Sequence, residues 1–373
     1  MKILFINHSS NFIYGATKSL TYLLKMSDFK YDLIIPRSKS INNDEIKNIV
    51  GCKLSNIYRC YVPLKNSGYY GCKTLKLKHK VIYMLKNLQA YLFLFQIKNI
   101  INKNDYDIIY LNSLVLYPLI NKKNKYIIHI REIFEGNSNL KKKIVNKLCQ
   151  AKGVFFIDKS TEQPFSDYLG SFLTLNNPID MRSVKKIEVA KIKEEVGIKE
   201  EEDIIFSIIG TSQEAKGIEF VIKAFKNAKK SNAYLLIVGN HKNNKYSDYC
   251  KLVAKDSEKI IFLEEMKEIE KIYAISDYII RGESIFGIGR TVYEGLYSGC
   301  KVILPSSKKE NEAMPDDLKG FEENVLFYQV RNIDHLSSVI KERSKCDKSK
   351  VKVRSNIEQY KEKWSNYLLK CNN

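Results

Sequence analysis

The clearest candidate for chemistry is a polar loop that spans residues 210–217. It follows the apolar run Ile204–Ile209 and precedes apolar residues at helical spacing, which predicts a buried strand, a loop and a helix. The loop ends in Lys216-Gly217. Amide groups at the start of a helix attract anions, and the lysine adds a full positive charge. The pattern therefore predicts a diphosphate site that needs no metal ion, although such connections with a solvent-exposed lysine are also common.

A second candidate lies in residues 278–305, where a predicted strand is followed by a glycine-rich loop and a helix. Glycines let a backbone approach a sugar and its phosphates closely. Gly287-Ile288-Gly289 lacks the third glycine of a dinucleotide-binding fingerprint. Glu294, one turn into the helix, is placed to accept both ribose hydroxyls of a nucleotide. Alternatively, its carboxylate only favours the helix dipole.

Polar residues also follow the apolar run at 126–130, where Arg131-Glu132 continues the chain. Ligands of open parallel sheets bind at the carboxyl ends of the strands. We therefore expect Arg131 and Glu132 to line a site, with His129 nearby because it points to the same face as Arg131. An ordinary core histidine is an equal alternative for His129.

The elements that position these residues form two series. Continuous apolar runs alternate with helical patterns, which is typical of parallel sheets covered by helices on both faces. The predicted strands are residues 3–6, 31–35, 108–111, 126–130 and 154–157, and then 204–209, 235–238, 260–263, 278–280 and 301–304. The predicted helices include residues 17–25, 80–101, 143–149, 218–229, 268–275 and 290–298.

Two α/β domains follow from these series. Asn176-Asn177-Pro178 is a stiff link, because proline fixes one torsion and asparagines favour turns. We expect an N-terminal domain of residues 1–180 and a C-terminal domain of residues 181–354. A closing helix from about residue 355 to 373 is expected to pack back on the first domain.

Taken together, these segments resemble glycosyltransferase family 4, whose members are retaining, nucleotide-sugar-dependent enzymes with the GT-B fold. The resemblance covers nearly the whole chain. Gly210 through Lys216-Gly217 matches the family's first donor loop, with Thr211 where arginine is frequent. Residues 283–303 resemble its second donor motif. The resemblance implies two doubly wound Rossmann-like domains that face each other across a cleft.

The resemblance also implies roles for individual residues. Glu294 would bind the ribose, and the donor would be a UDP-, GDP- or dTDP-sugar held without a metal. The implied donor-binding residues are Gly15, Ala16, Lys216, Phe286, Gly287, Ile288, Gly289, Arg290, Thr291 and Glu294. The implied catalytic residues are Glu283, Arg131 and His129. Asp105-Tyr106-Asp107 precedes a strand instead of following one, so we do not expect a metal site there.

One feature departs from the family pattern. Two glutamates usually lie eight positions apart, but position 286 is Phe286 and Glu283 lies eleven positions before Glu294. The match of Glu283 to the glutamate that touches the transferred sugar is therefore weaker than that of Glu294. This spacing, together with Thr211, is the support for a competing class, a non-catalytic sugar-nucleotide-binding or membrane adaptor.

The charge distribution points to an anionic partner of the first domain. The formal net charge is +20, and residues 1–180 hold 27 basic and 12 acidic side chains, against 35 and 30 in residues 181–373. A basic run at residues 72–80 beside the apolar residues 81–95 suits a helix on an anionic membrane surface. A core helix with a solvated basic turn is the alternative. No nucleic-acid-binding module accompanies the charge, so nucleic acid is not expected.

These observations define the expected setting. The eight cysteines contain no C-x-x-C pair, which favours reduced thiols in the cytoplasm. The first residues predict a buried strand instead of a signal peptide. We expect an enzyme of bacterial surface polysaccharide or glycan assembly that acts on a saccharide or lipid-linked saccharide acceptor. Its membrane attachment would be peripheral, at the inner face of the plasma membrane.

Overall fold

The computed structural model describes residues 1–9, 12, 15–37, 41–60, 92–134, 136–198, 200, 202–284, 288–306, 314–348 and 353–372. The chain divides into two compact units. The first consists of residues 1–178 and 356–373, and the second consists of residues 179–355. The sequence-based boundary at 180/181 and the returning tail from about residue 355 lie within two residues of this division.

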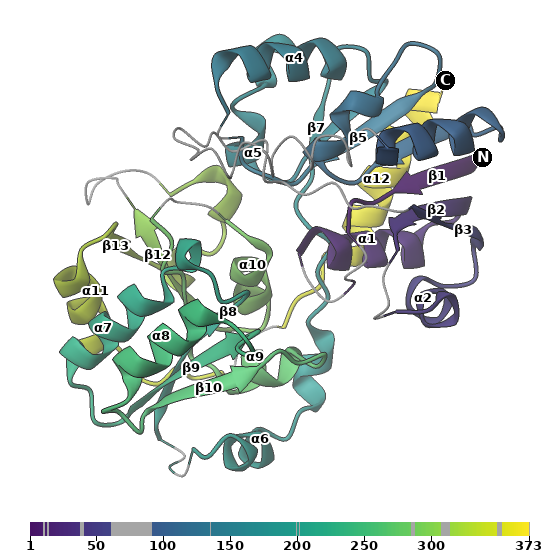
Figure 1. Cartoon of the computed structure of the whole chain (residues 1–373). Coiled ribbons are helices and arrows are strands. Elements are labelled where there is room, and N and C mark those ends of the chain that lie inside the picture. The colour runs from purple at the N-terminus through teal and green to yellow at the C-terminus, as the bar shows by residue number, and fades with distance from the viewer. Residues whose placement is uncertain are drawn as a thin grey trace. The chain divides into compact units, whose positions relative to one another are not determined.

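The first unit is built on a seven-stranded parallel sheet (Figure 1). Its strand order is β3-β2-β1-β4-β5-β6-β7. The strands are β1 (Lys2–Ile6), β2 (Lys30–Pro36), β3 (Leu54–Cys60), β4 (Ile108–Leu111), β5 (Tyr126–Ile130), β6 (Gly153–Phe156) and β7 (Leu173–Thr174). The helices are α1 (Gly15–Met26), α2 (Asn43–Val50), residues 92–102, α4 (Ser138–Leu148), α5 (Lys159–Glu162) and α12 (Ile357–Asn372), with 3-10 turns η2 (Leu114–Leu119) and η3 (Ser166–Tyr168).

Two cores cover the faces of this sheet. Side chains alternate along β1, so Leu4 and Ile6 join one core while Ile3 and Phe5 join the other. The C-terminal helix α12 completes the second core. Its Trp364 is fully buried and stacks on Phe5, with the ring centroids 6.3 Å apart. The tail is therefore an integral part of the first unit.

The second unit is built on a six-stranded parallel sheet with the order β10-β9-β8-β11-β12-β13. The strands are β8 (Ile204–Ile209), β9 (Ala233–Gly239), β10 (Ile260–Glu264), β11 (Tyr278–Ile280), β12 (Lys301–Ser306) and β13 (Val325–Gln329). The helices are α6 (Val189–Glu195), α7 (Ile218–Ala228), α8 (Lys245–Ala254), α9 (Glu270–Ile275), α10 (Arg290–Tyr297) and α11 (Ile333–Lys341). Four 3-10 turns, η4 (Arg182–Lys186), η5 (Glu214–Lys216), η6 (Asp316–Leu318) and η7 (Glu322–Asn324), complete the unit.

The strand order fixes where a ligand site should form. Along the second sheet the connections run outward from β8 in one direction and from β11 in the other. The chain therefore switches direction between β8 and β11. Open α/β sheets bind ligands at the carboxyl edge of such a switch point. The two loops singled out in the sequence follow these two strands.

The prediction of two doubly wound parallel sheets is confirmed, and all ten predicted strands are present. The apolar runs did not predict β3, β7 and β13, which contain half-buried or exposed residues. Residues 80–91 of the predicted helix lie outside the described residues. The basic run at 72–80 lies there too.

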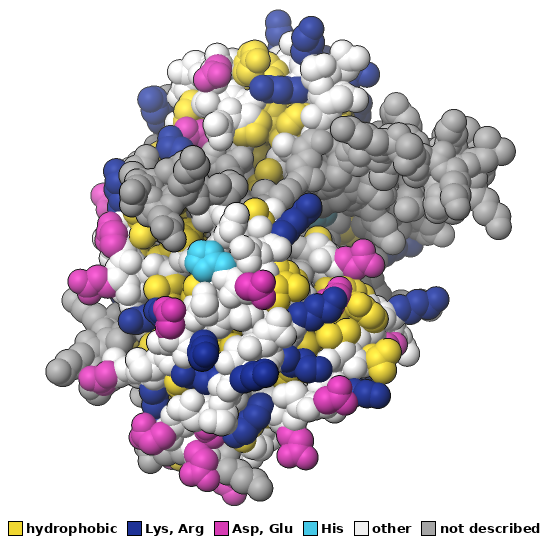
Figure 2. Space-filling view, turned by 90° about the vertical axis from the view of Figure 1, so that its left-hand side faces the viewer, with side chains coloured by type: hydrophobic (Ala, Val, Ile, Leu, Met, Phe, Trp, Pro, Cys, Tyr) yellow, Lys and Arg dark blue, Asp and Glu magenta, His cyan; other side chains and the backbone are white. Residues whose placement is uncertain are grey.

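No helix in the described part of the chain is long and apolar enough to span a bilayer. On the face that Figure 2 shows, basic and acidic side chains are interspersed over the lower half of the view.

Candidate active site

Gly217 and Gly282 bring the two loops of the second unit into backbone contact. Gly217 has a φ of 62°, in the left-handed region, and a Cβ atom there would overlap the carbonyl oxygen of Gly282. A Cβ atom on Gly282 would lie 2.5 Å from the carbonyl oxygen of Gly217. Only glycine fits both positions, because the backbones leave no room for a side chain. The loops after β8 and β11 therefore form one structure at the switch point.

Lys216 and Glu283 join these loops by an ion pair. The Lys216 Nζ lies 3.0 Å from Glu283 Oε1, and the lysine side chain keeps 36% of its surface exposed. Arg281 also binds Glu283, with its Nε 2.9 Å from Oε2 and its Nη2 2.5 Å from Oε1. Burial alone would raise the pKa of Glu283, but the two cations outweigh it and lower the pKa to about 2. Glu283 is therefore a poor base in this arrangement.

Arg281 also supports the loop that leads to α10. Its Nη1 donates to the Thr291 hydroxyl at 2.7 Å. A Cβ atom on Gly289 would lie 2.7 Å from the same nitrogen, so the guanidinium packs directly against the glycine backbone. Sequence reasoning did not assign Arg281 a role. Its signal was present, because it is the first residue after β11 and therefore at the carboxyl edge of the sheet.

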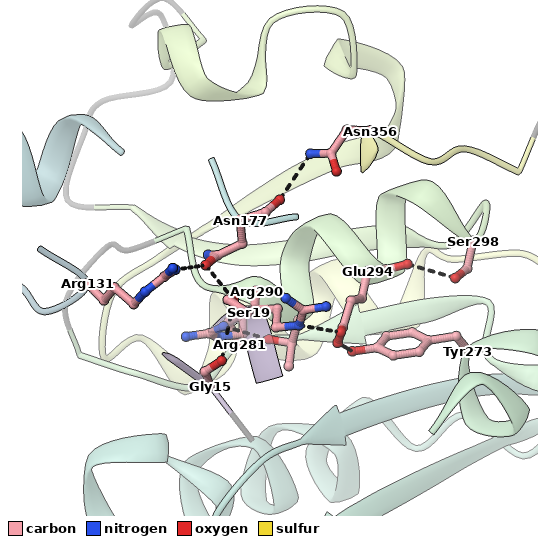
Figure 3. A network of polar contacts seen from close by, with 11 residues as sticks. Gly15, Ser19, Arg131, Asn177, Tyr273, Arg281, Arg290, Glu294, Ser298 and Asn356 are labelled. Atoms are coloured by element: carbon pink, nitrogen blue, oxygen red, sulfur yellow. Dashed lines mark hydrogen bonds and ion pairs between the residues drawn. The ribbon is translucent and has the colours of Figure 1, made fainter. Parts of the chain in front are cut away.

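Glu294 is buried, with 3% of its surface exposed, and its carboxylate is held from two sides. Oε1 accepts from Arg290 Nε at 2.7 Å, and Oε2 accepts from the Tyr273 hydroxyl at 2.8 Å (Figure 3). Arg290 and Glu294 are four residues apart on α10, which brings their side chains together. Ser298 donates to the Glu294 carbonyl oxygen at 2.7 Å. Tyr273 from α9 is a second residue that sequence reasoning missed.

His241 supports the loop at residues 210–217 through a contact with Ser212. Its Nδ1 lies 3.0 Å from the Ser212 hydroxyl, and the side chains of Asn240 and Asn244 bind the backbone of Ser212. Gly239 lies so close to the loop that a Cβ atom would overlap the carbonyl oxygen of Gly210. No motif in the sequence pointed to His241. Its part is structural, because it shapes the loop that carries Lys216.

The first unit presents Gly15 and Ala16 at the start of α1. Gly15 is exposed and has a φ of 52°, while the Ala16 carbonyl oxygen accepts from Asn112 Nδ2 at 3.2 Å. Asn112 also donates to Asn7 Oδ1 at 2.9 Å. The exits of β1 and β4 are thereby tied to this helix start. Residues 10, 11, 13 and 14 of the same loop lie outside the described residues.

Arg131 is buried in the first unit, where its side chain donates hydrogen bonds to two asparagine side chains. Its Nη1 donates to Asn177 Oδ1 at 2.8 Å (Figure 3). Its Nε donates to Asn112 Oδ1, also at 2.8 Å. Ser19 donates to the same Asn177 oxygen at 2.8 Å, and Asn356 donates to the Asn177 carbonyl oxygen at 3.0 Å. The guanidinium thus holds the linker to α1 and to the exit of β4. Arg131 is 9% exposed.

His129 lies in the core. It is fully buried next to Phe155, and its Nδ1 lies 2.7 Å from the Tyr110 hydroxyl and 3.2 Å from Arg131 Nη2. Burial, followed by the Arg131 charge, lowers the pKa of His129 well below its ordinary value. Glu132 accepts from the Ser113 hydroxyl and the Leu114 amide. The structure therefore describes His129 as a buried residue near the end of β5, in contact with Tyr110 and Arg131.

The remaining predicted positions are only partly described. Ile288 is buried, and Gly289, Arg290 and Thr291 lead into α10 as expected. Phe286 and Gly287 lie outside the described residues. Within the described parts of the chain, no group of three or more His, Cys, Asp or Glu residues is arranged to hold a metal ion. Two residues of the Asp105-Tyr106-Asp107 segment, which precedes β4, make structural hydrogen bonds. Tyr106 donates to Asp32, and Asp107 accepts from the Lys2 amide.

Known proteins resemble this chain in part of its sequence and in its fold. Residues 188–364 match the family model described as "Glycosyl transferases group 1". The fold is that of GT-B glycosyltransferases. The family match covers 177 of the 373 residues, and the likeness of the whole chain to solved structures concerns its fold. No curated protein sequence matches the chain.

Three solved structures illustrate the likeness of this glycosyltransferase fold. HepE from Anabaena, in complex with UDP and glucose, is 15% identical, with a TM-score of 0.64 over 100% of this chain and 97% of that one. Sucrose-phosphate synthase from Thermosynechococcus elongatus is 13% identical, with a TM-score of 0.67 over 99% and 96%. A glycosyltransferase from Rickettsia africae ESF-5 is 15% identical, with a TM-score of 0.65 over 100% and 95%. At these identities the likeness concerns the fold.

Proposed function

We propose that the protein transfers a sugar from a nucleotide diphosphate sugar to an acceptor hydroxyl with retention of the anomeric configuration. The observation that carries the proposal is the joined pair of loops at the switch point, where Gly217 meets Gly282 and Lys216 meets Glu283. Such a point is where an open α/β sheet binds a nucleotide. HepE, which shares the fold, was crystallised with UDP and with UDP-glucose, and this supports a nucleotide-sugar donor.

In this proposal the diphosphate lies at the two loops. Lys216 and the amides of the loops stabilise the negative charge that develops on the leaving diphosphate. Glu294 accepts hydrogen bonds from the ribose, and Arg290 orients its carboxylate. Glu283 acts by positioning Lys216 and Arg281, since both cations share its carboxylate. Lysine and amide groups supply the charge stabilisation for which other transferases use a metal ion, so we propose that the reaction needs none.

The proposed step breaks the bond between the anomeric carbon and the diphosphate oxygen. The acceptor oxygen forms its bond to the same carbon on the same face, and the acceptor proton passes to a phosphate oxygen of the leaving group. No enzymic nucleophile is required. Arg131 takes part through the linker it holds, because its side chain is engaged by Asn112 and Asn177.

A transfer assay with a panel of UDP-, GDP- and dTDP-sugars tests the proposal. The preferred donor should also raise the melting temperature, because a ligand that binds only the folded state stabilises it. Lys216→Ala should lower kcat/KM about a hundredfold or more, since one charge-stabilising group is worth that much. Lys223→Ala, a solvent-exposed lysine on α7, is the matched control and should retain activity. Near-normal transfer by Lys216→Ala would refute the proposal.

The same assay separates an enzyme from a non-catalytic adaptor. An adaptor would bind the nucleotide sugar and be stabilised by it without releasing the nucleotide. We favour the enzyme, because the ion pair between Lys216 and Glu283 leaves the lysine partly exposed at the junction of the loops. Nucleotide binding without turnover across the full panel would favour the adaptor instead.

For the acceptor we propose a lipid-linked saccharide in bacterial surface polysaccharide assembly, reached by peripheral attachment to the inner face of the plasma membrane. Leu92 and Phe95, on the helix at residues 92–102, expose 58% and 63% of their surfaces. Large apolar side chains at such exposure suit insertion into a membrane interface.

Flotation with vesicles that contain anionic lipid tests this attachment. We expect binding that weakens with salt, because it depends partly on charge. The double variant Leu92→Glu/Phe95→Glu should not float. Leu252→Glu, which changes a leucine 63% exposed on α8, is the matched control. Equal flotation of both variants would contradict the attachment.

A further inference from the structure

A cavity of about 1140 Å³ lies in the second unit, away from the two loops of the candidate site. Its wall includes Asp277, which directly precedes β11 and accepts a hydrogen bond from the Ile205 amide at the start of β8. The cavity is therefore at the amino-terminal edge of the sheet. The loops that carry Lys216 and Glu283 follow the opposite, carboxyl edge of the same two strands. The two sites are separate.

The apolar part of the cavity wall is aliphatic. It consists of aliphatic side chains from η4, α6 and the end of α9, which include Val184, Ile187, Val189, Ala190, Ala274 and Ile275. Among the described residues, no aromatic side chain lines the cavity. Aromatic rings are the usual stacking partners of bases, so the wall does not suit a nucleobase. It suits a flexible aliphatic chain, which is bound by burial of apolar surface.

The polar part of the wall carries more positive than negative charge. Four lysines line it, against the acidic Glu194 and Asp277. The lysines are Lys185, Lys193, Lys345 and Lys348. The Asp277 carboxylate oxygens accept from the amides of Ile205 and Cys346, and the Lys348 Nζ likewise donates to the Tyr273 carbonyl oxygen at 2.9 Å. The remaining field attracts an anion.

We propose that this cavity binds an alkyl anion, an aliphatic chain that ends in a phosphate or carboxylate, and that this binding is coupled to Glu294. Two wall residues provide the connection. Ala274 follows Tyr273, whose hydroxyl donates to Glu294 Oε2 at 2.8 Å, and Ser298 donates to the Glu294 carbonyl oxygen at 2.7 Å. A ligand that shifts α9 or the end of α10 therefore acts on the Glu294 carboxylate. The coupling rests on the proposed donor role of Glu294, whereas the binding does not.

Calorimetry on the full chain tests the binding. The probes are octyl phosphate and octanoate, used below their micelle concentrations, with inorganic phosphate and octanol as head-only and chain-only controls. We expect an alkyl anion to bind more tightly than either control. The comparison of octyl phosphate with octanoate identifies the preferred head. Binding of inorganic phosphate or octanol as tight as that of the better alkyl anion would overturn the proposal.

Charge-reversal variants locate the site. Lys185→Glu/Lys345→Glu changes two cavity lysines and should weaken alkyl-anion binding about tenfold or more, which corresponds to roughly 1.4 kcal/mol. Lys186→Glu/Lys191→Glu makes the same change in charge at exposed positions of η4 and α6 that do not line the cavity. It should bind like the parent protein. An equal loss in the two double variants would show non-specific attraction and overturn the site.

Nucleotide affinity tests the coupling. The Kd of the preferred nucleotide should change at least threefold when the cavity is saturated with the alkyl anion, and the reciprocal change should appear in the Kd of the anion. Tyr273→Phe should reduce both changes, because it removes the direct link to Glu294. An unchanged nucleotide Kd would overturn the coupling. If no nucleotide bound at all, the proposed function and the coupling would both fail, while the binding experiment would still decide the cavity.

Discussion

The backbone of Gly217 lies directly against that of Gly282, so that neither position has space for a Cβ atom. One glycine follows β8 by way of its loop, and the other follows β11. The contact is the point at which two separate motifs of the sequence become one site. It also places Lys216 and Glu283, the neighbours of these glycines, within ion-pair distance.

Gly217→Ala should lower the free energy of unfolding by about 2 to 4 kcal/mol, because a methyl group would both strain the backbone and overlap the Gly282 carbonyl oxygen. Gly320→Ala is the matched control. Gly320 also has a positive φ, 86°, but no atom lies within 4 Å of its hypothetical Cβ. It should cost only the backbone strain, about 1 kcal/mol. Denaturant unfolding measures both, and equal losses would show that the contact contributes nothing.

Glu283 should make stability depend on acid pH. Its pKa is about 2 in the folded chain and near 4.5 when unfolded, so its contribution is complete above the unfolded value and declines as the pH falls from about 5 towards 2. Between pH 6 and pH 3.5 the parent protein should therefore lose about 1 kcal/mol more than Glu283→Gln. Urea unfolding at the two pH values gives the comparison. Parallel losses in the two proteins would argue against the ion-paired arrangement.

Much of the fold could be predicted because buried parallel strands consist of consecutive apolar residues, which are easily recognised in the sequence. Ile204–Ile209 is an example, in which both faces of the strand are covered and nearly every residue is buried. Strand β3 was missed because it is mostly half-exposed at the sheet edge, where polar residues are tolerated. The position of each loop after its strand also followed from the sequence.

The partners of the site residues could not be predicted in the same way. Spacing along the chain indicates which residues share a loop, but not which residues of two loops meet. Lys216 pairs with Glu283 from a different loop, and Tyr273 reaches Glu294 from a different helix. Arg131 was expected to line the site, whereas its guanidinium binds Asn177 in the linker.

The pairing of Arg131 with Asn177 should be strong enough to measure. In a double-mutant cycle of Arg131→Met and Asn177→Ala, we expect a coupling energy of about 1 to 3 kcal/mol in unfolding free energy, because both side chains are buried. Arg182 and Asp180 provide the control pair. Their ion pair is partly exposed, so Arg182→Met with Asp180→Ala should give less than about 1 kcal/mol. A coupling between Arg131 and Asn177 as small as that of the control would contradict a role in anchoring the linker.

The two hydrogen bonds on Glu294 should have separable effects on donor use. Glu294→Gln removes the charge that pairs with Arg290 and should lower kcat/KM about a hundredfold, whereas Tyr273→Phe removes one neutral donor and should cost about tenfold. Circular dichroism must first show that both variants are folded. Tyr249→Phe, at a half-exposed tyrosine that donates to Glu219, is the control for loss of a hydroxyl and should leave transfer unchanged. If Glu294→Gln transferred sugar within twofold of the parent rate, the ribose would have to be bound elsewhere.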